Sequence, residues 1–139
     1  VAVGAASPEW AGVAGAGPVP GRWRVRVITD GRFTESQPRH GGVTSFDQGL
    51  TAVLEHPAGL TVMVTTERMA PFSLGQLRHA GLDPAAFSHL VAKGVHAPVA
   101  AYGEVCRSFV RVDTPGVTSA GLDRLDYRHR RRPLHPFER

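Results

Sequence analysis

The 139-residue sequence has little cysteine and no long apolar run. Its single cysteine, Cys106, cannot form an internal disulfide, and it lies in an apolar stretch where a buried thiol is common. A membrane span needs a run of about 18 apolar residues, which does not occur, and the first residues lack the basic segment of a signal peptide. We therefore expect a protein of the reducing cytoplasm that has no membrane partner.

The sequence also lacks the ligand spacings of a metal site. A zinc site needs two ligands close together on one element and a third that converges on them. The seven histidines are dispersed, and no His-Glu-x-x-His or His-x-His pattern occurs. The Gly-x-Ser-x-Gly turn of serine hydrolases is missing as well, and Cys106 is expected to pack in the core. We expect neither a metal ligand nor a catalytic residue in these residues.

Positive charge is the most uneven feature of the composition. The formal net charge is +4, and much of the excess lies near the C-terminal end, at Arg128, Arg130, Arg131, Arg132 and Arg139. Such a cluster can bind phosphates through counterion release, but arginines that contact a partner's carboxylates are commoner. Nucleic acid is therefore not an expected partner. A stand-alone binding module for anionic partners, using this Arg-rich tail, remains the alternative function.

Composition divides the chain into three parts. Residues 1–21 are rich in Gly, Ala and Pro without a helical or strand period, which is typical of the end of a preceding segment followed by a linker. The chain starts with Val1 rather than Met, so we expect a region before it. Residues 22–113 are expected to form an α+β domain. Residues 114–139 are expected to be an extended basic tail, packed on that domain or on an N-terminal region.

The first half of the domain has the pattern of strands. Residues 22–27 alternate, with Val25 and Val27 on one side and the arginines on the other. An Asp-Gly turn then leads to a short strand at 33–35. Residues 50–55 and 60–66 flank a Pro/Gly turn and predict a hairpin. The β-branched content of 60–66 favours a central strand covered on both faces.

Helical signals dominate the second half. Ser73 is a suitable N-cap for a helix that Gly81 would end, and Pro84 suits the first position of a further turn. The expected elements are a helix at 74–80, a turn at 83–87, a strand at 90–93, a helix at 98–106 and a strand at 109–112. The fold class is α+β, with a mixed, largely antiparallel sheet and two or three short helices packed on it.

Two segments could carry a binding site. In one, an apolar strand ends in Thr66 and Arg68, and strand ends commonly present ligand-binding groups. In the other, Lys93 and His96 enclose a flexible glycine at the start of a helix, where backbone N–H groups favour anions. Together they would suit a substrate carboxylate or a developing oxyanion. The alternative is that Arg68 pairs with Glu67 or Glu55 and that Lys93 is merely solvated.

These segments belong to a set of short stretches that occur in order along nearly the whole chain. The stretches are Val27-Ile28-Thr29-Asp30-Gly31-Arg32-Phe33, Gly49-Leu50-Thr51-Ala52-Val53-Leu54, Val64-Thr65-Thr66-Glu67-Arg68 with Pro71-Phe72, Lys93-Gly94-Val95-His96, Asp113-Thr114-Pro115-Gly116, and Leu125-Asp126-Tyr127-Arg128 with Arg131-Arg132-Pro133 and Pro136. In these stretches the sequence resembles the C-terminal region of the MlrC (microcystin-degradation) family of zinc metallopeptidases.

The resemblance implies a zinc-dependent hydrolase of amide or peptide bonds, whose zinc site lies in an N-terminal region absent from this chain. That region and a peptide-like or small amide substrate are the implied partners, and the chain alone is expected to be inactive. The resemblance implies substrate binding or oxyanion support for Thr66, Arg68, Lys93 and His96. Where the family usually has an aromatic residue and an arginine after its Lys-x-x-His motif, Ala97 and Pro98 follow, which removes a stacking surface and a cation.

Overall fold

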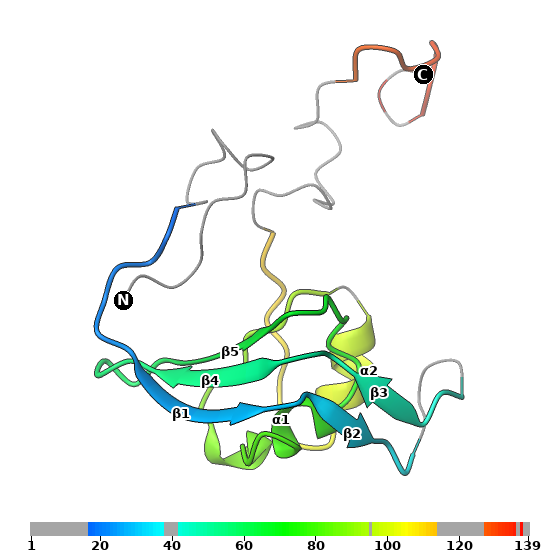
Figure 1. Ribbon diagram of the computed structural model, residues 1–139. Coiled ribbons are helices and arrows are strands. Elements are labelled where there is room, and N and C mark those ends of the chain that lie inside the picture. Colours follow the sequence, from blue (N-terminus) through cyan, green and yellow to red (C-terminus); the bar gives the residue numbers. More distant parts are fainter. Residues whose placement is uncertain (1–16, 38–41, 95, 114–126, 136, 138–139) are drawn as a thin grey trace. The chain divides into compact units, whose positions relative to one another are not determined.

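The chain divides into two compact units in the computed structural model (Figure 1). The structure describes residues 17–37, 42–94, 96–113, 127–135 and 137. The larger unit includes Val19–Phe109 and carries every helix and strand of the described residues, and the smaller unit includes Val110–Arg139. In these ranges no helix has the length and apolar character needed to cross a membrane.

A three-stranded antiparallel sheet forms the larger unit's centre. Its strands are β1 (Arg24–Thr29), β4 (Thr51–Glu55) and β5 (Thr61–Thr65), in the order β1-β4-β5. The predicted hairpin of β4 and β5 is confirmed, with Val53 opposite Met63. The prediction that 60–66 is the central strand is wrong, because β1 pairs with the other side of β4 and leaves β5 at an edge.

A bulge interrupts the alternation of β1. Val25 lies opposite Leu54 and Val27 opposite Val53, so Arg26 is an extra residue with no residue opposite it in the β4 register. Because neighbouring residues of β4 point to opposite faces, Val25 and Val27 do so as well. The prediction that these two valines share a face is therefore wrong. Arg26 donates instead to the Glu55 carboxylate, at 3.1 Å, and to the Gly81 carbonyl oxygen, at 3.4 Å.

The chain after β1 leaves the sheet and forms a separate two-stranded ribbon. Strand β2 (Arg32–Thr34) was expected, whereas no strand was predicted at its partner β3 (Ser45–Asp47). The rings of Phe33 and Phe46 stack across the ribbon, with centroids 5.2 Å apart. The Asp-Gly turn thus redirects the chain and does not fold β2 back on β1.

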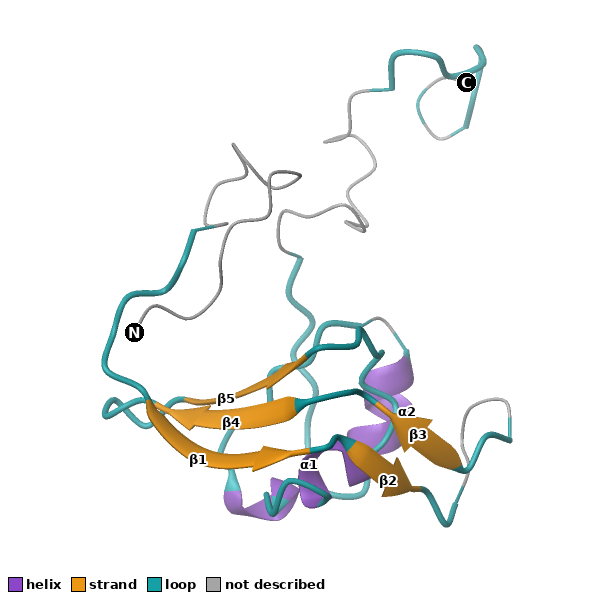
Figure 2. Cartoon of the chain, viewed as in Figure 1, coloured by secondary structure: helices purple, strands orange, loops and turns teal. Residues whose placement is uncertain are grey.

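The larger unit has three short helices (Figure 2): α1 (Gly75–Arg78), η2 (Pro84–Ala86) and α2 (Ala97–Tyr102). Residues of α1 and next to η2 pack on one face of the sheet, whereas α2 has an apolar cluster of its own. The prediction of Ser73 as the N-cap of α1 is wrong by one residue, because Leu74 occupies that position and makes no side-chain capping hydrogen bond. The Ser73 hydroxyl nevertheless accepts the Gly75 N–H at 2.9 Å, which satisfies one donor at the start of the helix. The Asp83 carboxylate accepts the Ala85 N–H in the same way. Helix α2 ends earlier than predicted, because Gly103 is a poor helix former and the chain turns there.

The strands predicted at 90–93 and 109–112 do not form in the structure. Leu90 and Ala92 pack on the side chains around α2, and Val91 between them is fully exposed, so this segment follows the helix surface and pairs with no described strand. Val110 and Val112 are 86% and 73% exposed. The alternating apolar residues of 109–112 therefore do not indicate a strand here, because no described strand pairs with this segment.

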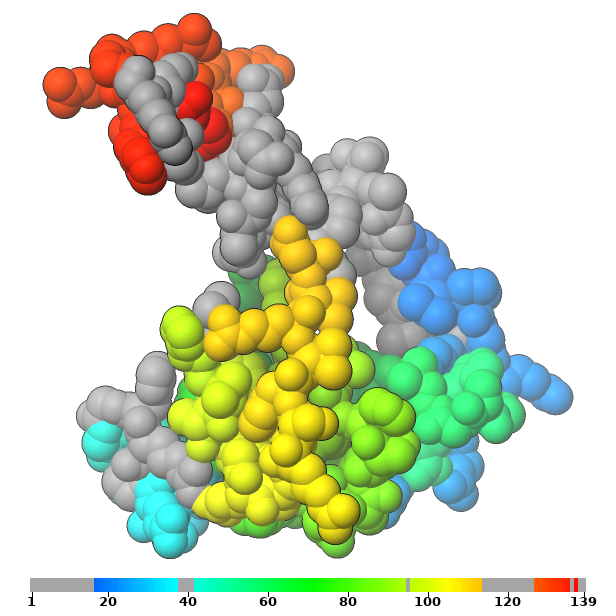
Figure 3. All heavy atoms as spheres, turned by 180° about the vertical axis from the view of Figure 1, so that it is seen from behind, coloured from blue at the N-terminus to red at the C-terminus, as the bar shows by residue number. Residues whose placement is uncertain are grey.

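Two apolar clusters hold the larger unit together. The first joins the sheet to α1 and η2 through Val53, Ala80 and Leu82. The second surrounds α2, with Leu74, Ala101 and Tyr102 at its centre, and burial raises the pKa of the Tyr102 phenol. Figure 3 shows, from behind, the yellow and yellow-green segment that includes α2 spread over that side of the unit.

Candidate functional site

The segment after β5 is fixed by the corner between β3 and β4. The N–H groups of Thr66 and Glu67 donate to the carbonyl oxygens of Leu50 and Gln48, both at 3.1 Å. A Cβ atom on Gly49 would lie only 2.1 Å from Thr66 Oγ1, so the hydroxyl rests against bare backbone at this point. The side chain of Thr66 is exposed, yet its position is well defined by these contacts.

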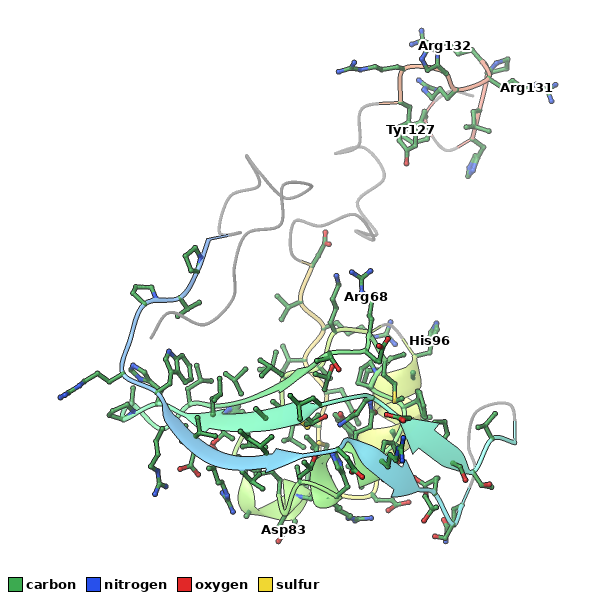
Figure 4. All side chains as sticks on the ribbon, in the orientation of Figure 1. Arg68, Asp83, His96, Tyr127, Arg131 and Arg132 are labelled. Atoms are coloured by element: carbon green, nitrogen blue, oxygen red, sulfur yellow. The ribbon has the colours of Figure 1, made fainter. Side chains whose placement is uncertain are left out.

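Arg68 follows two residues later and extends outward from this anchored segment (Figure 4). Its side chain is exposed, and the described residues provide no ion-pair partner for it. The expected alternative of a pair with Glu55 is wrong, since the Glu55 carboxylate is bound by Arg24 and Arg26. These hydrogen bonds, chiefly the one from Arg24, lower the pKa of Glu55.

Gly94 brings the second segment against the first. A Cβ atom on Gly94 would lie 2.9 Å from Pro98 Cδ and 3.5 Å from Pro71 Cγ. Pro71 is three residues beyond Arg68, and Gly94 lies between Lys93 and His96 in the sequence. The two cation-bearing segments therefore approach each other where the Gly94 backbone lies near the Pro71 ring.

His96 occupies the N-cap position of α2. Its carbonyl oxygen accepts the N–H groups of Val99 and Ala100, whereas its exposed ring makes no capping hydrogen bond. Lys93 is exposed too, on an irregular segment instead of the predicted strand end. Pro98, which stands where the family resemblance implies an arginine, is buried and lies against Gly94.

The four predicted site residues thus lie on two segments that converge, and all four are exposed. Figure 4 shows Arg68 and His96 at one end of the larger unit and Asp83 away from them. Cations without carboxylate partners attract anions from solvent, and a nearby hydroxyl adds a neutral donor. The arrangement can therefore hold a carboxylate or stabilise developing negative charge.

No group of three His, Cys, Asp or Glu side chains suited to a metal ion occurs among the described residues. Cys106 is partly buried beside the cluster around Tyr102, and its N–H donates to the Tyr102 carbonyl oxygen at 2.8 Å. His96 and Cys106 lie beyond opposite ends of α2, and no hydrogen bond joins them in the structure as described. Their arrangement gives no support to a cysteine hydrolase that uses these two side chains.

Comparison with known families identifies the chain. The family model described as MlrC C-terminus matches residues 1–129. The chain belongs to the MlrC C-terminus family. No curated protein and no solved structure gave a match.

One feature of this MlrC C-terminal domain was missed by the sequence analysis. A cavity of about 260 Å³ lies beside the start of α1, and its polar lining includes Glu35, Ser73, Arg78 and Glu104. The Ser73 hydroxyl donates to the Glu35 carboxylate across its wall. Only the capping signal of Ser73 was visible in the sequence, because Glu35 comes from a loop far away along the chain.

The described part of the smaller unit of the MlrC domain contains a local aromatic contact. The rings of Tyr127 and Phe137 lie 5.1 Å apart, and the Arg130 guanidinium lies 4.7 Å above the Phe137 ring. At least one arginine of the basic tail is therefore engaged in a cation-π contact. The predicted docking of this tail on the domain or on an N-terminal region remains a prediction.

Proposed function

We propose that this chain forms the substrate-cleft side of an MlrC-like hydrolase that cleaves amide or peptide bonds, with its zinc held by an N-terminal region outside these residues. The observation that carries the proposal is the meeting of the Arg68 and His96 segments at Gly94. The family match supports it, since the model describes the C-terminus of MlrC proteins. The described residues do not offer a zinc ligand set, so the residues that would hold the zinc belong to that N-terminal region in this proposal.

Each site residue has a role that follows from its chemistry. Arg68 can bind a substrate carboxylate through two parallel N–H donors, and Lys93 adds a point charge. The anchored Thr66 hydroxyl and a ring N–H of His96 can donate to the oxygen that becomes negative when an amide carbonyl is attacked. Binding by Arg68 and Lys93 would orient the substrate. Hydrogen bonds from Thr66 and His96 would stabilise the transition state, because they strengthen as negative charge develops on the carbonyl oxygen.

The test compares the 139-residue chain with the full polypeptide that includes the N-terminal region. We expect the chain alone to contain no stoichiometric zinc in elemental analysis and to have no amidase activity. In the full polypeptide, Arg68→Ala should raise KM about tenfold with kcat largely kept, as expected for loss of ground-state binding. His96→Ala should lower kcat about a hundredfold, as expected for loss of an oxyanion donor.

Arg22→Ala is the matched control, because Arg22 is an exposed arginine at the other end of the sheet, next to the start of β1. Its kinetic constants should equal those of the unaltered protein. Zinc at about one per chain together with amidase activity in the isolated 139-residue chain would overturn the proposal, as would unchanged kinetics in both site variants.

A further inference from the structure

The sheet of the larger unit presents only one of its faces to the helices. Val27, Val53 and Met63 lie opposite one another on neighbouring strands and pack into the first apolar cluster. Residues of the other face alternate with these. No described helix or strand covers that second face, which we call the open face (Figure 2). Its side chains on the three strands are Val25, Ile28, Ala52, Leu54, Val62 and Val64.

The open face is apolar and uncharged, although several of its side chains are in contact with solvent. Ile28 is 60% exposed, Val25 54% and Val64 38%. The charged side chains of the same strands lie elsewhere, since Arg26 bonds to Glu55 and to the helix side of the sheet. A sheet face that contacts water normally carries polar residues, so an aliphatic one is typical of a surface that another element covers.

The size of the open face indicates what kind of partner covers it. With strands about 4.8 Å apart and a rise of about 3.3 Å per residue, three strands of five residues present on the order of 250 Å². A complex between separate proteins needs about 800 Å² from each partner. A second copy of the chain would be held weakly by so small a surface. A region of the same polypeptide needs less area, because the covalent link supplies a high effective concentration.

The open face also continues into the candidate site. After Val64, the next position on the same side of the strand is Thr66, whose hydroxyl rests on Gly49. Arg68 follows, without an ion-pair partner among the described residues. An element that covers the open face would therefore end beside the two residues proposed to bind substrate.

We propose that the open face is the docking surface for the N-terminal region of the same polypeptide, which is thereby held beside Thr66 and Arg68. The inference rests on the proposed function, because that function requires such a region, and it adds which face of the domain receives it. The region should present apolar side chains without charge to this face, because a buried unpaired charge would cost more than the contact contributes.

Thiol labelling tests the docking without reference to activity. Ile28→Cys places a thiol on the open face, and Ala86→Cys places one on an exposed position of η2 as the control. Each variant is prepared in the 139-residue chain and in the full polypeptide, and labelling at that position is followed by mass spectrometry of its peptide. We expect Ile28→Cys to react at least about tenfold more slowly in the full polypeptide, and Ala86→Cys to react equally in both.

Three results would overturn the inference. Equal reaction of Ile28→Cys in both proteins would show that the face stays open. Slow reaction in the 139-residue chain that increases on dilution would assign the face to a second copy. Slow reaction of Ile28→Cys in the 139-residue chain at every concentration would mean that other residues of this chain cover the open face. A full polypeptide that protects Ile28→Cys but hydrolyses no amide would reject the proposed function and keep this docking surface.

Discussion

The backbones of Gly31 and Gly49 cross so closely that a Cβ atom on Gly31 would lie 2.0 Å from the Gly49 carbonyl oxygen. Gly31 also has a φ of +74°, a conformation that other residues adopt at a cost. We expect Gly31→Ala to lower the free energy of unfolding by about 3 kcal/mol, from overpacking and backbone strain together. Urea unfolding of the larger unit measures the change.

Gly59 provides the control for this crossing. Its φ is +85°, but nothing lies within 4 Å of a Cβ atom placed there. Gly59→Ala should therefore cost only the strain of the left-handed conformation, about 1 kcal/mol. Equal costs for the two variants would mean that the crossing is looser than the distance indicates.

Ser73 links the start of α1 to the loop that follows β2. Its side chain is almost completely buried, accepts the Gly75 N–H and donates to the Glu35 carboxylate. Ser73→Ala leaves both groups without this partner, so we expect a loss of about 1 to 2 kcal/mol in the free energy of unfolding. The exposed Ser36 is the control, and Ser36→Ala should change stability by less than about 0.5 kcal/mol.

Glu55 makes stability depend on pH. Its hydrogen bonds with Arg24 and Arg26 hold its pKa in the folded protein below the ordinary 4.5, so the unfolded chain binds more protons at mildly acidic pH. The stabilisation of the folded state by the ionised Glu55 is fully present above about pH 4.5, and it is lost as the pH falls through the lower pKa of the folded protein. Urea unfolding between pH 6 and 3 should show a shallower decline in Glu55→Gln. An identical decline in both proteins would contradict the prediction.

The Arg-rich tail is expected not to make the chain a nucleic-acid-binding module. Arg130 is already placed over the Phe137 ring, which ties part of this charge to local packing. We therefore expect replacement of Arg128, Arg131 and Arg132 by Gln to change retention on duplex DNA at about 0.15 M salt by less than about twofold. A steep salt dependence that disappears in this variant would favour the alternative function, a module for anionic partners.

Local patterns were sufficient for much of the fold but not for its pairing. The hairpin of β4 and β5 follows from apolar runs on either side of a Pro/Gly turn, so its register is set locally. Strand β3 has only three residues, and it pairs with β2 across a long loop. No local sequence pattern predicts this pairing. The segment at 90–93 resembles a strand in composition but packs on α2, because tertiary contacts override a weak propensity.

The candidate site was predictable as residue types but not as an arrangement. Strand-end and helix-start signals indicated Thr66 and His96, yet their segments meet through Gly94, whose packing against Pro71 and Pro98 depends on residues far apart in sequence. The cavity beside Ser73 escaped detection for the same reason, since its carboxylates come from different segments. The spacing of residues along the chain predicts which side chains come together only when a single helix or strand carries all of them.

The extra residue in β1 determines which changes of chain length this strand tolerates. Arg26 has no residue opposite it in the β4 register, so deleting it would keep Val25 opposite Leu54 and Val27 opposite Val53 and would remove only its own hydrogen bonds. Deleting Val27 instead would carry Arg26 into the core position opposite Val53, and deleting Val25 would bring the guanidinium onto the apolar face opposite Leu54. Loss of the Arg26 codon would therefore preserve the pairing register of this strand, whereas loss of the Val25 or Val27 codon would disrupt it.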